Sequence, residues 1–218
     1  MVSSGKIVDL RALLAARFPA PAPRPADCLI TGLESLDQPG GAGLAKGGIT
    51  ELISPNLSAG SASFIAAMIN AAQRDRYFVA LIDGRDSFDP QPVGNHALRH
   101  LLWLRCRTTV QAVKSADLLL RDGNFPVVIA DLVLNSPNEL RKIPQTSWYR
   151  LQRLVEATAT AFVVLTRSNT VSSAQLKIVL ENAWTLQTVQ HENPASFLRV
   201  RVRRSHRSTS HRVNAVAG

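Results

Sequence analysis

The chain has 218 residues, 45% of them hydrophobic, which is enough to bury one full core but cramped for two domains. No apolar run approaches the roughly 18 residues that a membrane-spanning helix needs, so a membrane span is excluded and a cytoplasmic protein is expected. The formal net charge of +9 attracts polyanions, which makes nucleic acid the leading class of partner. Two cysteines, Cys28 and Cys106, lack CxxC or Cys/His spacing, so neither a zinc site nor a disulfide framework is indicated.

An amphipathic helix is predicted for residues 1–18, because Ile7, Leu10, Leu13 and Leu14 fall on one helical stripe. Charged residues interrupt this segment, unlike the apolar region of a signal peptide. Residues 19–28 follow as an extended linker, since every second position from 19 to 25 is proline. The helix must bury its stripe either on its own body or on a neighbouring copy of the chain.

An α/β domain is predicted for residues 29–206, because short apolar runs typical of buried parallel strands alternate with longer helical runs. The expected central strands are 49–54, 77–83, 126–131 and 161–166, and the expected helices are 61–74, 109–121 and 147–159.

The end of the chain alternates with period two instead. Residues 184–190 and 196–204 predict an antiparallel hairpin at the sheet edge, with Val200 and Val202 inward and Arg199, Arg201 and Arg203 outward. Residues 207–218 form a basic tail.

Three segments in order resemble the core of the RecA recombinases. "TGLESLDQPGGAGLAKGGITELISP" (31–55) resembles the entry to the phosphate loop, "ALIDGRDSFDP" (80–90) the strand carrying the catalytic glutamate, and "VVIADL" (127–132) the Walker B strand. Each motif alone is weak, but the ordered set covers roughly residues 29–204. The resemblance implies a RecA-like core with a mainly parallel sheet flanked by helices. It also implies an N-terminal helix that docks on the next subunit, and hence a homo-oligomer.

The phosphate loop itself departs from the pattern GxxxxGK[ST], whose lysine neutralises the phosphates and whose hydroxyl holds magnesium. In "ELISPNLSAGSASF" (51–64), an ungapped alignment puts Ser54 at the first glycine, Gly60 at the lysine and Ser61 at the hydroxyl. A shift by one residue puts Ser61 at the lysine, so neither register supplies a cation. No lysine lies between positions 46 and 114, and only three arginines could substitute from a distance: Arg74, Arg76 and Arg85.

The other nucleotide positions are altered as well. The catalytic glutamate aligns with Arg85, which cannot act as a general base at neutral pH. The residue that senses the γ-phosphate aligns with Arg167. Asp131 keeps the Walker B place, where an aspartate can equally cap a turn. Ser54, Gly60, Ser61 and Asp131 therefore form a vestigial nucleotide site, and we expect no ATP cofactor, no metal site and no catalysis.

Longer segments are similar to the ImuA group, the RecA-like accessory proteins of bacterial mutagenesis cassettes. They are "HLLWLRCRTTVQAVKSADLLLRDGNFPVVIADL" (100–132) and "RKIPQTSWYRLQRLVEATATAFVVLTR" (141–167). This likeness implies a noncatalytic adaptor for error-prone translesion synthesis in an SOS-type response. The implied partners are a Y-family polymerase homologue, ImuB, and an error-prone replicative-type polymerase, with RecA as a further candidate. Two alternatives stay open: a SulA-type cell-division inhibitor, and a RecA-like ATPase or DNA-filament protein with an atypical loop.

Single-stranded DNA is a possible ligand, because RecA proteins grip it with two loops that correspond here to residues 135–147 and 167–175. Neither loop offers an aromatic side chain before Trp148, which begins a helix and fits a core better than a base platform. "RKIP" (141–144) could equally be a protein-docking edge, and the arginines near the end could be a solvated strand face. The DNA-binding candidates are Arg141, Lys142, Arg167, Arg199, Arg201, Arg203 and Arg204.

Overall fold

The computed structural model describes residues 28–37, 43–57, 59–182 and 198–205. The predicted N-terminal helix, nearly all of the linker, the expected strand 184–190 and the basic tail lie outside these described residues.

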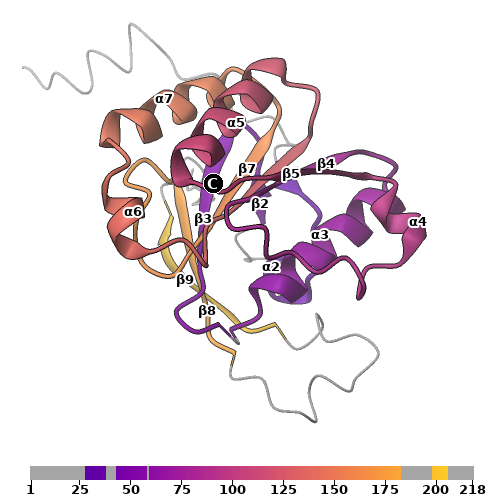
Figure 1. Ribbon diagram of the computed structural model, residues 1–218. Coiled ribbons are helices and arrows are strands. Elements are labelled where there is room, and N and C mark those ends of the chain that lie inside the picture. Colours follow the sequence, from indigo (N-terminus) through magenta and orange to yellow (C-terminus); the bar gives the residue numbers. More distant parts are fainter. Residues whose placement is uncertain (1–27, 38–42, 58, 183–197, 206–218) are drawn as a thin grey trace, which may run out of the picture.

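Seven of the described strands form one sheet in the order β5-β4-β6-β7-β3-β8-β9 (Figure 1). They are β3 (Gly48–Ile53), β4 (Val79–Asp83), β5 (Leu101–Arg105), β6 (Val127–Asp131), β7 (Ala161–Thr166), β8 (Leu176–Leu180) and β9 (Val200–Ser205). Neighbouring strands from β5 to β8 are parallel, and β9 pairs antiparallel with β8. The predicted α/β class, with a mainly parallel sheet and an antiparallel pair at its end, is therefore confirmed. A separate two-stranded sheet joins β1 (Cys28–Leu29) to β2 (Leu44–Ala45).

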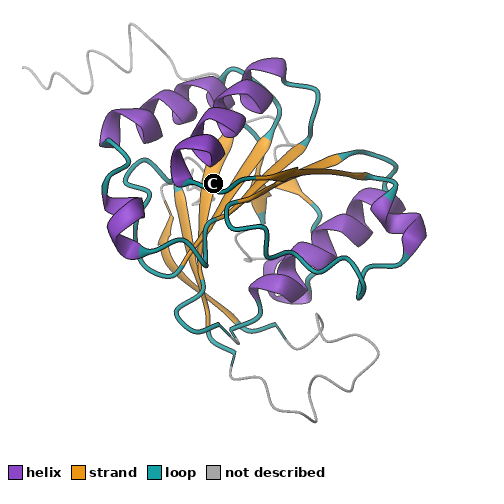
Figure 2. Ribbon diagram, in the orientation of Figure 1, coloured by secondary structure: helices purple, strands orange, loops and turns teal. Residues whose placement is uncertain are grey.

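Helices cover both faces of the sheet (Figure 2). One face carries α2 (Glu34–Asp37), α3 (Ser61–Arg74) and α4 (Asn95–Leu98); the other carries α5 (Thr109–Asp122), α6 (Pro137–Arg141) and α7 (Gln145–Glu156). Side chains alternate between the two cores, so that on β3 Leu52 packs on the α3 side and Ile49 on the α5–α7 side. None of the described helices is long and apolar enough to cross a membrane.

Local signals explain where α5 and α6 begin and end. Thr108 accepts a hydrogen bond from the Gln111 amide at 3.2 Å and so caps α5, which ends at Gly123 in the left-handed conformation with φ 70°. Ser136 and Glu139 form a reciprocal capping box at the start of α6.

The sheet edge differs from the sequence prediction in two ways. The partner of β9 is β8, a strand that was not predicted from the sequence. β5 was not predicted either. Val200 packs against the core, but Val202 is 45% exposed, so the burial expected from its predicted inward orientation is not found. Val202 pairs in regular register with Ile178 and so stays on the face of Val200; the register shift lies beyond it, and β9 is the last strand of the described sheet, where a side chain has a neighbouring strand on one side only.

Candidate functional site

Hydrogen bonds within the turn and to the end of β7 hold the turn between β3 and α3 in place. The Ser54 amide donates to the Thr166 carbonyl at 2.7 Å, and the Ser54 hydroxyl donates to the Asn56 carbonyl at 3.0 Å. Gly60 adopts φ 104°, a left-handed backbone that favours glycine, and leads into α3 without a side-chain cap. Ser61, the first residue of α3, is 9% exposed. Three of the four residues predicted for a vestigial nucleotide site therefore do share this turn.

Three arginines were predicted as possible substitutes for the missing lysine. In the part of the chain that the structure describes, none of them points toward this turn. Arg74 forms an ion pair with Asp75 at 2.7 Å at the far end of α3, about 20 Å from Ser61 along the helix. Arg76 follows Asp75 at that same end. Arg85 is engaged elsewhere, because its guanidinium donates to both oxygens of Glu139 at 2.8 and 2.7 Å.

The carboxyl end of β4 is organised by Asp83, which is fully buried. Its carboxylate accepts hydrogen bonds from the amides of Arg85, Ser87 and Phe88 at 2.8–3.2 Å and from the Trp103 indole at 3.3 Å. These donors saturate the carboxylate, so Asp83 holds the turn of residues 84–88 in place rather than presenting an acid to solvent.

Asp131 ends β6 directly beside Asp83 in the sheet register. Burial raises the pKa of Asp131 to about 6; the bond from the Val133 amide, 3.1 Å long, opposes this shift and the charge of Asp83 adds to it. In the register Asp131 faces Leu165, and Leu165 faces Leu52, so Asp131 lies two strands, or about 10 Å, from β3. The bond from the Val133 amide shows Asp131 capping the turn that follows β6.

The side chain of Arg85 is part of a surface network at this edge. Its ion pair with Glu139 joins the β4 turn to α6. Next to it, Asp86 has φ 53° and pairs with Arg105 at 3.0 Å, and the Arg105 guanidinium lies 4.0 Å from the centre of the Trp103 ring. The place predicted for a catalytic base thus holds a neutralised cation.

Two loops that were predicted to contact DNA meet at a small cavity of about 310 Å³. Its lining includes Arg141 at the end of α6 and Ser168, Asn169 and Thr170 from the segment after β7. Arg141 donates to Asn138. Trp148 also borders the cavity but is 2% exposed, which agrees with its predicted place in the core.

The other arginines predicted to bind DNA lie at opposite ends of the strands. Arg167 is exposed directly after β7, and Arg199 is exposed next to Val200, which pairs with Leu180 at the carboxyl end of β8. The other β9 candidates follow along the strand: Arg201 is ion-paired with Glu181, whereas Arg203 and Arg204 lie toward the opposite edge. Lys142 lines a groove on the α5–α7 face. The structure therefore brings Arg141, Arg167 and Arg199 to one edge and leaves the others apart.

The structure contains a buried ion pair beneath residues 167–175, which was not predicted from the sequence. The ammonium of Lys177 on β8 lies 2.6 Å from one carboxylate oxygen of Glu51 on β3, and both side chains are buried. The other oxygen of Glu51 accepts hydrogen bonds from Thr166, Thr170 and Val171 at 2.6–3.0 Å. The pair therefore fixes residues 167–171 against the sheet. Its signal in the sequence was one charge inside each of two apolar runs, "ITELI" and "LKIVL".

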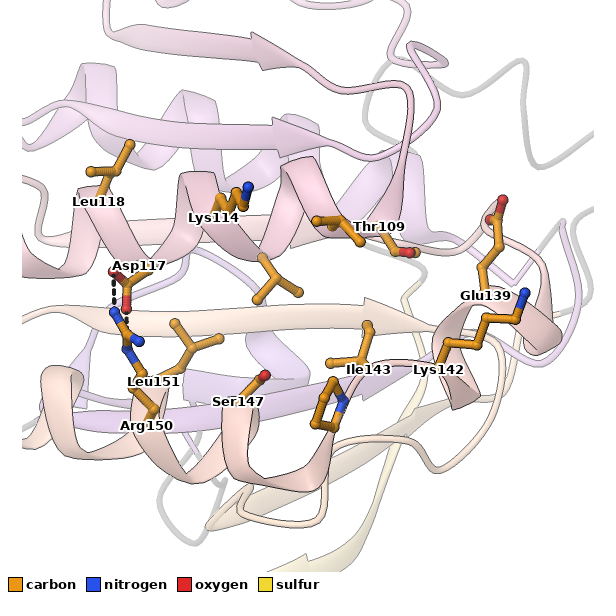
Figure 3. A pocket seen from close by; sticks show the side chains of 13 residues that line it. Thr109, Lys114, Asp117, Leu118, Glu139, Lys142, Ile143, Ser147, Arg150 and Leu151 are labelled. Carbon is orange, nitrogen blue, oxygen red and sulfur yellow. Dashed lines mark hydrogen bonds and ion pairs between the residues drawn. The ribbon is translucent and has the colours of Figure 1, made fainter.

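A groove of about 530 Å³ between α5 and α7 was also missed (Figure 3). Val110 and Leu118 line it and are 60% and 68% exposed. The sequence signal for these exposed residues was the apolar pattern of α5, which is wider than the apolar stripe that packs against the sheet.

Comparison of the sequence with protein-family models and with curated proteins finds no match. The fold and the site together define an α/β protein whose carboxyl-edge turns are held by their own side chains and bordered by arginines.

Proposed function

We propose that this chain is a noncatalytic accessory protein with a RecA-like core, acting as an adaptor that brings an error-prone polymerase to damaged DNA. The observation that carries the proposal is the state of three positions at the carboxyl edge of the sheet. The β3–α3 turn holds no cation among its described residues, Arg85 is paired with Glu139, and Asp131 caps a turn.

The topology supports a RecA-like core. The strands to which the resemblance assigns the phosphate turn, the glutamate and the Walker B aspartate are β3, β4 and β6. All three run parallel within one sheet and end at the same edge, as a shared nucleotide site requires.

The chemistry of a triphosphate supports the loss of ATP hydrolysis. A phosphate loop needs a lysine for the β and γ phosphates, and Gly60 or Ser61 stands in its place. Gly60 has φ 104°, so a lysine at this position would be strained as well as newly charged. The turn is thus suited to joining β3 to α3 and not to holding a nucleotide.

Calorimetric titration of the full chain with ATP and magnesium tests this part. We expect no saturable heat and no phosphate release. The matched variant is Ser61→Asp, since an acid in the first helical turn favours α3 but repels phosphate. Saturable ATP binding that Ser61→Asp abolishes would refute the proposal and favour the ATPase alternative; binding that Ser61→Asp leaves unchanged would be to the basic surface.

Weak binding of single-stranded DNA is the second part, and it rests on Arg141, Arg167 and Arg199 at one edge. Each phosphate contact should contribute about 0.7 to the slope of log affinity against log salt. We expect Arg141→Ala and Arg167→Ala each to flatten this slope for a fluorescein-labelled oligothymidylate, measured by anisotropy. Arg74→Ala, which removes an ion-paired arginine at the far end of α3, should leave it unchanged. Equal slopes in all three variants would contradict DNA contact at this edge.

The partners are proposed from the same resemblance: the polymerase homologue ImuB, an error-prone replicative-type polymerase and RecA. Co-elution of the purified chain with purified ImuB tests the adaptor role, and failure to co-elute would remove its main support. Homo-oligomerisation through residues 1–18 is proposed with it. Light scattering of the full chain carrying Leu10→Glu and Leu13→Glu should then report a smaller species than the unmodified chain.

A further inference from the structure

The α5–α7 groove has the form of a docking surface. α5 and α7 lie side by side on one face of the sheet, and Figure 3 shows Leu118 on α5 and the side chain of Leu151 between the two helices. Leu151 and Ile143 are buried and form its floor, whereas Leu118 and Val110 are exposed on α5. Exposed apolar side chains above an apolar floor mark an interaction site rather than an ordinary solvated helix face.

A bidentate ion pair links the two helices that form the groove. Arg150 of α7 donates to both oxygens of Asp117 of α5, at 2.8 and 3.0 Å, and Arg121 donates to the same carboxylate at 2.8 Å. Although burial opposes the effect, the bonds from these two arginines hold the pKa of Asp117 below its usual range. The two helices are therefore cross-linked at the surface, which preforms the groove.

The rim of the groove is positive. Both acids of its lining are ion-paired with arginines, Asp117 as described and Glu139 with Arg85. Lys114 and Lys142 also line the groove and are exposed, and neither has an acidic partner among the described residues. A partner that buries its apolar side chains here therefore gains further by bringing carboxylates to these two lysines.

The length of the groove matches a short helix. Val110 and Leu118 are eight residues apart on α5, a span of about 12 Å, and a helix that presents apolar side chains at i, i+3, i+4 and i+7 covers about 10 Å.

We propose that the α5–α7 groove is the docking site for an acidic amphipathic helix of a partner protein. Its apolar side chains would lie between Val110, Leu118 and Leu151, and its carboxylates would face Lys114 and Lys142. Charge disfavours two other occupants. A second copy packed on this face by two-fold symmetry would set the same lysines against each other. The chain's own N-terminal segment, residues 1–18, carries three basic residues and one acidic residue.

Three labelled peptides test the proposal by fluorescence anisotropy on the full chain at low salt. The first is a designed helix with leucine at i, i+3, i+4 and i+7 and glutamate on its flanks. The second is the same helix with lysine in place of every glutamate, and the third is residues 1–18 of this chain. Neither DNA nor nucleotide is present, so the result is independent of the proposed function.

We expect the glutamate peptide to bind, and Leu118→Ser to weaken its affinity about tenfold or more. Ile30→Ser is the matched control, because Ile30 is 66% exposed and lies outside the groove, and it should have no effect. Lys114→Glu with Lys142→Glu should reverse the preference toward the lysine peptide.

The proposal is overturned by any of four results. They are no binding of the glutamate peptide, equal or tighter binding of either other peptide to the unmodified chain, no effect of Leu118→Ser, and an unchanged preference after the double charge reversal.

Discussion

Replacement of Lys177 by methionine is the sharpest test of the core, because Lys177 neutralises a carboxylate in the middle of the sheet. The side chains of Lys177 and Glu51 are 5% and 0% exposed, and their charged atoms lie 2.6 Å apart. Methionine keeps an unbranched side chain one heavy atom shorter and removes the charge, together with the bonds of the ammonium to Asn169 and the Val171 carbonyl. Glu51 keeps hydrogen bonds from Thr166, Thr170 and Val171 but loses its only ion pair among the described residues.

The expected loss of stability is large for one substitution. Removing one partner of a buried pair lowers the free energy of unfolding by about 3–5 kcal/mol, since an uncompensated charge stays buried. For a chain of this size each kcal/mol shifts the melting temperature by roughly 2–4 °C, so the drop should be on the order of 6–20 °C.

Urea unfolding followed by circular dichroism measures the effect. Asp75→Ala is the control, because it breaks the exposed Arg74–Asp75 pair, and it should change stability by less than about 1 kcal/mol. Glu51→Leu combined with Lys177→Met should recover much of the loss, since no charge then remains buried. A Lys177→Met protein within about 1 kcal/mol of the unmodified chain would refute the buried pair.

Three further substitutions test the turns and caps. Asp131→Asn should raise stability at pH 7.5 by roughly 1–3 kcal/mol: the folded-state pKa is raised from 3.8 to about 6, so the carboxylate destabilises the fold progressively as pH rises from about 3.8 to about 6, and fully above that. The gain should shrink to less than about 1 kcal/mol at pH 4, and urea titrations at both pH values check it. Gly84→Ala should destabilise by more than about 2 kcal/mol, because a Cβ there would lie 2.3 Å from Asn135 Oδ1 and 2.8 Å from the Asp131 carbonyl; an unchanged melting temperature would contradict this close approach. Thr108→Ala should lower stability by about 1 kcal/mol through loss of the α5 cap, whereas Thr108→Ser should retain it, as thermal melts would show.

The fold class and the central strands could be predicted because parallel strands buried on both faces read as apolar runs. β7 has the predicted bounds, β3 is shifted by one residue toward the N-terminus, and β4 and β6 begin two residues and one residue later than predicted. β8 was missed because Lys177 interrupts its apolar run, and the ion pair that makes this lysine compatible with the core involves a residue 126 positions away. Local pattern cannot reveal such a partner.

The candidate site was predictable in part for the same reason. The β3–α3 turn follows from the sequence because it depends on neighbouring residues, and a turn cap was one of the two roles that the sequence left open for Asp131. The pairing of Arg85 with Glu139 does not, because the two are 54 residues apart and meet only when α6 packs beside the end of β4. The α5–α7 groove likewise exists only once the two helices are neighbours.

The link between Arg85 and Glu139 restricts which residues position 85 can accept. A glutamate introduced there would face a second carboxylate where Glu139 now accepts two hydrogen bonds, so an attraction between opposite charges would become a repulsion between like charges. Glu139 cannot be exchanged without loss either, because it also completes the capping box with Ser136. Introduction of an acid at position 85 therefore lowers stability whether residue 85 or residue 139 changes first.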